Sequence, residues 1–398
     1  MIAHARRTLF WCHFVVGMTI GLVVAFIATT GAIMAFQDHV IAFAERSVEV
    51  QSASKAPCVS VEAALQAVRA QTGEIPASVQ VFSDAARPAL VTMPHGETFL
   101  VDGCGGRVLA AGSRWRKFFE NDQNLHRWLA LSRGRHETMR ALKNAAVVAF
   151  LFLLLSGLVL WVPRQWRATN LRSALLLRRG LKGKARLWNV HQVFGVFAAI
   201  PLISIILTGL MMAYPWAMQT ALRVMRSDEP VVAKSHAVRQ PVESFHGINA
   251  MLQQAAGKDP RWKSISFALP EANEKNVAFT IDEGAGNRPS QRATLVFGRR
   301  DGHEVRWTPF VAQGRALRWR TEVKYLHTGE IFGLAGQIVV FLAVMSALTQ
   351  VVTGFGMAWK RWRARRERLL RVAQRASFDS QRTMKPSPSE SSGSTINV

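Results

Sequence analysis

The sequence predicts a mixed membrane protein: a bundle of four transmembrane helices, built from two tandem repeats, with two α+β lobes outside the membrane. Three observations predict this fold. They are four long apolar runs, basic clusters next to the spans on one side of the membrane, and histidine and glycine positions that occur twice. Composition alone decides little, because 49% hydrophobic and 19% charged residues among 398 fit either a soluble or a membrane protein.

Four stretches of the chain are almost free of charge. They are residues 14–36, 145–162, 192–217 and 331–359. As α-helices rising about 1.5 Å per residue, each can cross a hydrocarbon core of about 30 Å. Buried helices of a large soluble protein are the alternative, but uncharged runs of about 18 residues or more are typical of membrane spans. The first run is also too long for the apolar region of a signal peptide, so we interpret it as a retained anchor.

The net charge of +24 is concentrated in three clusters. Arg6 and Arg7 precede the first span, residues 163–190 contain eight basic residues and no acidic one, and residues 360–368 contain six basic residues. All three clusters fall on one side of a four-span protein. The positive-inside rule therefore predicts both termini in the cytoplasm. We expect the membrane to be the bacterial inner membrane. Basic residues at a membrane surface are expected to contact anionic lipid rather than nucleic acid.

One unit of the chain occurs twice: a helix that begins with histidine, an external segment, a Leu-His pair and a second helix. Gly31 lies 18 residues after His13, and Gly209 lies 18 residues after His191. The shared pairs are Leu125-His126 and Leu326-His327, with Thr30-Gly31, Ser156-Gly157, Thr208-Gly209 and Thr353-Gly354 at the helix ends. Small residues allow helices to approach closely, and we expect this role for the Ser/Thr-Gly pairs.

Each external segment is predicted to form a periplasmic lobe with one helix on a small antiparallel sheet. The helices are expected at 61–72 and 242–256. Strands are expected at 78–82, 89–93, 98–102 and 106–110 in the first lobe, and near 264–269, 277–281 and 291–297 in the second. Cys58 and Cys104 both belong to the first lobe, where a disulfide is permitted, and the sequence leaves open whether they pair.

The predicted boundaries follow these elements. In the first half they are 1–37 for the cytoplasmic N-terminus and first span, 38–124 for the first lobe, and 125–163 for a histidine-containing segment and the second span. A cytoplasmic basic loop at 164–190 connects the halves. In the second half they are 191–218 for the third span, 219–325 for the second lobe, 326–360 for a histidine-containing segment and the fourth span, and 361–398 for a basic, partly disordered cytoplasmic tail.

Four histidines stand at equivalent positions of the two repeats. His13 and His191 begin spans on the cytoplasmic side, and His126 and His327 precede spans on the external side. Two neutral imidazoles from opposing helices can bind the two sides of a haem iron. The sequence therefore predicts two b haems, one per membrane face, about 25 Å apart along the helices.

Other interpretations of the histidines stay open. A single histidine at a membrane edge is more often an interfacial side chain, and zinc or copper would compete with haem, although two histidines without thiol or carboxylate partners make a poor zinc site. His39 and His136 are reserve ligands. No catalytic residue is indicated. Because the sequence lacks a nucleotide-binding loop, the electron donor must be external, a quinol or a flavoprotein.

The chain resembles the PepSY-associated transmembrane family. The matching segments are Leu125–Leu129 (LHRWL), Ser156–Arg164 (SGLVLWVPR), Leu326–Gly333 (LHTGEIFG) and, in the first lobe, Ser60–Leu65 (SVEAAL) with Val101–Gly103 (VDG). This resemblance implies PepSY-like lobes, b haems on the four matching histidines, and reduction of ferric siderophores for iron uptake. About four extra residues after His126, including His136, leave the external ligand on that helix open. The alternative is a membrane-anchored module that regulates or binds a periplasmic protein without redox chemistry.

Overall fold

A computed structural model describes most of the chain. It leaves undescribed residues 1, 49–59, 104, 130–135, 164–171, 173–174, 226–246, 271–273, 285, 287 and 384–398, and it describes only the backbone of residues 2–3, 136 and 376–383. The cysteines Cys58 and Cys104 lie outside the described residues, so their pairing stays a prediction.

Four helices of the described chain are long and apolar enough to cross a membrane, which confirms the predicted spans. They are α1 (Ile2–Met34), α5 (His136–Trp161), α7 (Gly183–Ala213) and α11 (Gly333–Thr383). Helix α1 packs against α5 and α11, and α7 packs against the same two helices, so the four form a bundle. Glycine permits close approaches between these helices: a Cβ on Gly21 of α1 would lie 2.7 Å from the Phe355 ring of α11.

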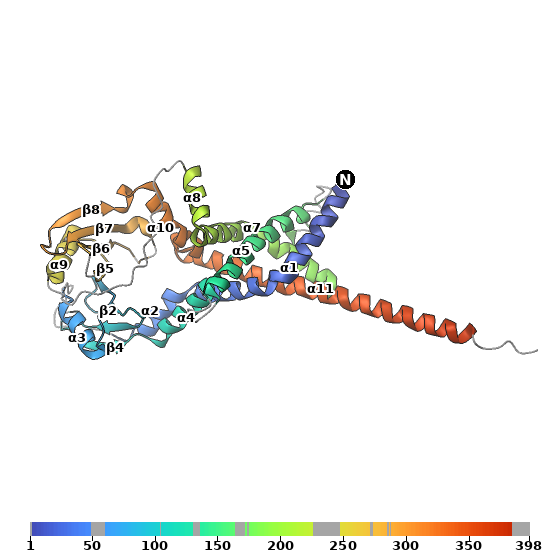
Figure 1. The fold of residues 1–398 in the computed structure, drawn as a ribbon, viewed down its shortest axis with the longest axis horizontal. Coiled ribbons are helices and arrows are strands. Elements are labelled where there is room, and N and C mark those ends of the chain that lie inside the picture. The colour runs from blue at the N-terminus through green and yellow to red at the C-terminus, as the bar shows by residue number, and fades with distance from the viewer. Residues whose placement is uncertain are drawn as a thin grey trace, which may run out of the picture.

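The sheet and the chain's N-terminus lie at opposite ends of this bundle (Figure 1). We call the end where α1 finishes at Met34 the sheet end, and the end where α5 finishes at Trp161 the far end. The last part of α11 continues past the far end as a helix to Thr383, and its residues 359–375 are exposed. The sequence predicts a partly disordered tail at 361–398, and the structure shows that the first part of this tail is helical. Good helix formers and the i,i+4 ion pairs of Glu367 with Arg363 and Arg371 favour this helix.

The two predicted lobes form one structure instead of two. Their strands make a single eight-stranded antiparallel sheet in the order β4-β3-β2-β1-β5-β6-β7-β8. The strands are β1 (Ser78–Phe82), β2 (Ala89–Thr92), β3 (Thr98–Val101), β4 (Val108–Ala111), β5 (Ser264–Ala268), β6 (Asn276–Asp282), β7 (Arg292–Gly298) and β8 (Glu304–Pro309). Strand β8 is absent from the sequence-based prediction.

Pairing between β1 and β5 joins the two halves. Ser78 lies opposite Ala268 and Phe82 opposite Ser264 in this antiparallel register. Each four-stranded half would otherwise expose an edge of unpaired backbone N–H and C=O groups, and edge pairing satisfies both at once. The prediction of two separate lobes is therefore wrong, because each half completes its sheet only with the other.

Helices α3 (Glu62–Thr72) and α9 (Ile248–Lys258) share one apolar core on this sheet. The core contains the fully buried side chains of Leu65, Leu252 and Phe279. The two helix N-termini also bond each other: Asn249 Oδ1 accepts from the Glu62 N–H at 3.1 Å, and Glu62 Oε1 accepts from the Asn249 N–H at 3.0 Å. Burial of a side chain as large as leucine contributes about 1.5–3 kcal/mol, so this shared core holds the halves together.

Short helices connect the sheet to the bundle. They are α2 (Gln37–Glu45), α4 (Arg114–Trp128), α8 (Pro215–Val224) and α10 (Arg315–Thr328), with the 3₁₀ turns η2 (Pro289–Gln291), η3 (Phe310–Ala312) and η4 (Glu330–Phe332). Helix α4 packs on α1 and α10 on α7. Both halves thus run in the same order: spanning helix, short helix, sheet helix, four strands, connecting helix and second spanning helix.

Candidate histidine site in the helix bundle

At the far end of the bundle, two histidines each contact a hydroxyl of a neighbouring spanning helix. His13 Nδ1 of α1 lies 2.8 Å from Ser156 Oγ of α5. His191 Nδ1 of α7 lies 2.9 Å from Thr353 Oγ1 of α11. Each contact joins the first and second spanning helix of one half of the chain.

The sheet end repeats this arrangement with the histidines on the connecting helices. His126 Nδ1 of α4 lies 2.9 Å from Thr30 Oγ1 and 3.1 Å from the Ile27 carbonyl oxygen, both on α1. His327 Nδ1 of α10 lies 3.1 Å from Thr208 Oγ1 and 2.9 Å from the Ile205 carbonyl oxygen, both on α7. All four histidines therefore bond a hydroxyl within their own half.

These hydrogen bonds define the tautomer of each ring. The carbonyl oxygens of Ile27 and Ile205 can only accept, so Nδ1 of His126 and His327 carries the proton. At the far end the hydroxyls donate to carbonyls of their own helices, Ser156 to Leu153 at 3.1 Å and Thr353 to Thr349 at 2.6 Å. Those hydroxyls accept from Nδ1–H of the facing histidine. In every case Nε2 keeps its lone pair, which is the form of imidazole that binds a metal.

A glycine provides the space for each ring. A Cβ on Gly31 would lie 3.3 Å from Cε1 of His126, and one on Gly209 would lie 3.2 Å from Cε1 of His327. The corresponding distances at the far end are 3.4 Å from Gly157 to His13 and 3.8 Å from Gly354 to His191. The Ser/Thr-Gly pairs thus serve the histidines directly, whereas the sequence assigned them only to helix packing. The sequence signal for this role was that the Ser/Thr-Gly pairs recur in both halves, the first pair at the same spacing from the first histidine.

His13 and His191 line one cavity of about 970 Å³. Its walls come from all four spanning helices and are mainly apolar, with Phe14, Leu154 and Phe355 among the lining residues. Glycines form part of the walls at Gly17, Gly21, Gly157, Gly195 and Gly354, so the helix backbones are accessible there. Ligand sites are usually concave, mostly apolar and of about this volume.

His126 and His327 lie near enough to interact electrostatically. Burial above all, and then the charge of His327, lowers the pKa of His126 to about 3. Lys143 and Arg127 add to the same effect. His126 is therefore neutral at pH 7, as a metal-binding imidazole must be.

The other histidines are placed differently. Nε2–H of the reserve ligand His39 donates to Gln337 Oε1 at 3.1 Å, and Gln337 in turn donates to the Ala35 carbonyl, so His39 connects α2 to α11. His136 begins α5, but its side chain lies outside the described residues. His95 and His303 are exposed in the sheet region, beside Glu74 and Asp301.

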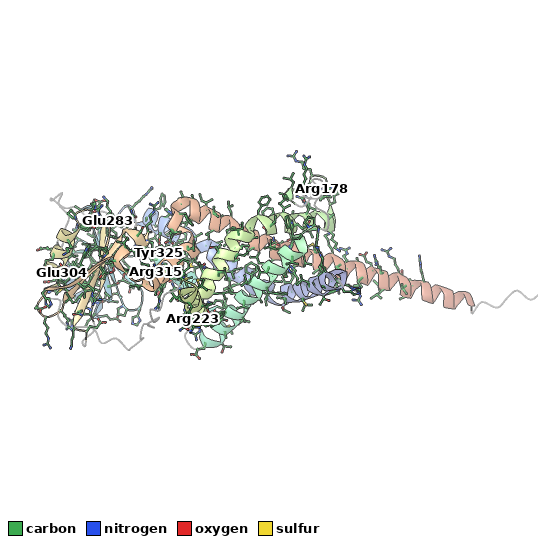
Figure 2. The ribbon with its side chains drawn as sticks, turned by 90° about the horizontal axis from the view of Figure 1, so that it is seen from above. Arg178, Arg223, Glu283, Glu304, Arg315 and Tyr325 are labelled. Carbon is green, nitrogen blue, oxygen red and sulfur yellow. The ribbon has the colours of Figure 1, made fainter. Side chains whose placement is uncertain are left out.

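Polar networks hold the two connecting helices that carry His126 and His327. In the first half, Arg116 of α4 makes two hydrogen bonds to Glu45 of α2, at 2.7 and 2.6 Å. In the second half, Arg292 of β7 bonds Asp282 of β6 at 2.7 Å, and its guanidinium lies 5.2 Å from the ring of Tyr325 on α10. Figure 2 shows Tyr325 on α10, between the sheet and the bundle.

Asp122 is a buried carboxyl that the sequence analysis did not consider. It lies one helical turn before His126, only 5% exposed, and within the described chain its Oδ2 has no hydrogen-bond partner. Burial raises the pKa of Asp122 to about 6. A lone aspartate in a polar helix carries no sequence signal for such burial.

The chemistry of the cavity fits a bis-histidine haem better than a bare metal ion. Two Nε2 lone pairs, apolar walls and exposed glycine backbone suit a flat apolar ring with iron at its centre. Among the described residues, no group of three or more His, Cys, Asp or Glu side chains could hold a metal ion. Haem ligation itself stays a prediction.

Comparison with known proteins gives one family. The PepSY-associated TM region matches residues 10–361, which include α5, α7, the sheet, most of α1 and the first part of α11. No curated protein matches the chain.

Proposed function

The chain belongs to the PepSY-associated transmembrane family, and we propose that it is a haem b protein that passes electrons across the bacterial inner membrane to ferric siderophores. One haem would bind His13 and His191, and the other His126 and His327. The observation that supports this proposal most is the repeated histidine arrangement: four rings with Nδ1 bonded to a hydroxyl and Nε2 left as a lone pair.

The residues of the chain would set the conditions for electron transfer. When bound, haem iron takes up and releases single electrons. The four hydroxyls orient the rings and hold the Nδ1 protons, and outer hydrogen bonds of this kind also tune the metal. Helix α1 sets the separation of the two sites, because the 18 residues from His13 to Gly31 span about 27 Å of helix. The walls of the far-end cavity are mainly apolar, which suits the apolar part of a haem.

The direction of transfer follows from the proposed topology. In this topology the end of the bundle with the basic clusters faces the cytoplasm, next to anionic lipid, and the sheet lies in the periplasm; the positive-inside rule supports this orientation. A quinol or a flavoprotein supplies the electron. At the periplasmic end one electron reduces the ferric ion of the siderophore to the ferrous form, which oxygen ligands bind more weakly.

The test is the absorption spectrum and haem content of the full-length protein, purified in detergent from haem-sufficient cells. Wild type is expected to show a reduced-minus-oxidised b-haem spectrum. The variants His13→Ala/His191→Ala and His126→Ala/His327→Ala should each lose one of the two haems. His95→Ala/His303→Ala is the matched control, because these exposed histidines lie outside the bundle and should leave the content unchanged.

A colourless wild-type protein would refute the haem proposal and favour the alternative, a membrane-anchored module that binds a periplasmic partner without redox chemistry. Substrate is tested separately. Dithionite-reduced protein mixed with a ferric hydroxamate siderophore should transfer its electrons, so that a ferrous-specific chelator captures iron. If the haem spectrum stays reduced in that mixture, the siderophore is not the acceptor.

A further inference from the structure

Three basic side chains line the cavity that contains His13 and His191. They are Arg178, from the segment before α7, Lys184, from the first turn of α7, and Arg361 of α11. All three are exposed, so they form the rim of the cavity and face solvent as well. Figure 2 shows Arg178 in the bundle region, away from Tyr325 and the sheet.

Contacts near the histidines position two of the three rim residues, the backbone of Arg178 and the side chain of Arg361. Asn189, buried and two residues before His191, accepts a hydrogen bond from the Arg178 N–H at 2.8 Å and donates to the Leu176 carbonyl at 3.1 Å. This fastens the segment that carries Arg178 to α7. The Arg361 guanidinium lies 4.5 Å from the Trp11 ring of α1, a cation–π contact.

No acidic side chain lies among the described residues that line this cavity. Three positive charges therefore lie at an apolar cavity whose described lining contains no carboxylate to balance them. Arginine and lysine in this setting bind carboxylates and phosphates with charge-assisted hydrogen bonds. The cavity thus favours a ligand with a large apolar body and negative charge on one edge.

We propose that Arg178, Lys184 and Arg361 bind the two propionate carboxylates of the haem at the far end. This assignment rests on the proposed function. The carboxylates would then meet the basic rim, and the apolar part of the ring would contact lining residues such as Val24 and Leu202. An anionic lipid headgroup offers the same chemistry to the same cations, so the experiment must separate the two sources.

The experiment compares haem b with its dimethyl ester, in which both carboxylates are blocked. Full-length protein in the His126→Ala/His327→Ala background leaves only the cavity site, and both compounds are titrated into haem-depleted protein. The rim variant is Arg178→Gln/Lys184→Gln/Arg361→Gln. Its matched control is Arg179→Gln/Lys182→Gln/Arg365→Gln, which removes the same charge from neighbouring positions outside the cavity lining.

The background protein and the matched control should bind the free acid about tenfold more tightly than the ester. The rim variant should bind both equally, and Arg178→Lys/Arg361→Lys should keep most of the preference. If the rim variant keeps the same preference for the free acid, the assignment is wrong. Binding of each protein to phosphatidylglycerol vesicles is measured as well. If the rim variant loses only its binding to these vesicles, the rim binds lipid and the assignment is also wrong. A background protein that binds neither compound, together with a colourless wild type, would refute the proposed function as well.

Discussion

The two ends of the bundle present the same histidine geometry on different supports. At the far end, His13 and His191 belong to the spanning helices α1 and α7, and helix packing alone places their rings. At the sheet end, His126 and His327 belong to the connecting helices α4 and α10, whose other ends join the sheet. We infer that the far-end site depends only on the bundle, whereas the sheet-end site also depends on the fold outside the membrane.

The two halves differ within the sheet-end site. Asp122 precedes His126 by four residues, and the equivalent position before His327 is Val323, which is fully buried. One connecting helix thus buries a carboxyl where the other buries an apolar side chain. The duplicated arrangement is conserved in its rings and hydroxyls but not in its charge, so the two halves should respond differently to pH.

The largest expected effect comes from filling the space beside one ring. Gly31→Leu would place side-chain atoms where the His126 ring lies, since a Cβ alone would approach Cε1 to 3.3 Å. This variant should lose the sheet-end haem and keep the other. Gly157→Leu should do the reverse, because it crowds His13 instead. Haem content and spectra of the two variants measure this. Loss of both haems in either variant would contradict the independence of the two sites.

A smaller effect is expected from the ion pair that holds α4. Burial raises the pKa of Glu45, but the hydrogen bonds and charge of Arg116 lower it on balance. The pair therefore stabilises the fold at neutral pH, and this contribution is lost as the pH falls through the pKa of Glu45. Arg116→Met leaves the 10% exposed Glu45 side chain without its partner and should cost about 2–3 kcal/mol.

Thermal unfolding and haem retention check this prediction. The expected result is faster loss of the sheet-end haem in Arg116→Met with the far-end haem retained. Glu45→Gln/Arg116→Met is the matched control, because it removes both charges and should recover part of the stability. Equal destabilisation of both sites would show that the far end also depends on the sheet.

The smallest effect concerns Asp122. Because burial raises its pKa to about 6, the folded protein binds this proton more tightly than the unfolded chain. Below the pKa of an unfolded carboxyl, Asp122 is protonated in both states and the folded protein keeps its full stability. As the pH rises through about 6, the buried carboxyl ionises and this part of the free energy of unfolding is lost. Asp122→Asn should therefore stabilise the protein by about 1–2 kcal/mol at pH 8 and hardly at all at pH 4. Melting temperatures at the two pH values measure this, with the exposed Glu120→Gln as control. An equal shift at both would exclude titration of Asp122.

Local patterns in the sequence were sufficient for much of this molecule. The four spans follow from uncharged runs, and the paired histidine and glycine positions follow from counting residues along helices. Each of these features depends on neighbours within a few turns of one chain segment. The sequence could not show the pairing of β1 with β5, because an exposed strand edge does not specify which other strand satisfies it.

By itself, then, the sequence determined the membrane class, the number of spans and the residues that recur in both halves. Only the tertiary structure decided which hydroxyl each ring bonds, that His13 and His191 share a cavity with three basic residues, and that the two external segments complete one sheet. Contacts such as that of His13 with Ser156 join residues 143 positions apart. Helix packing creates them, and no local periodicity encodes which helices will meet.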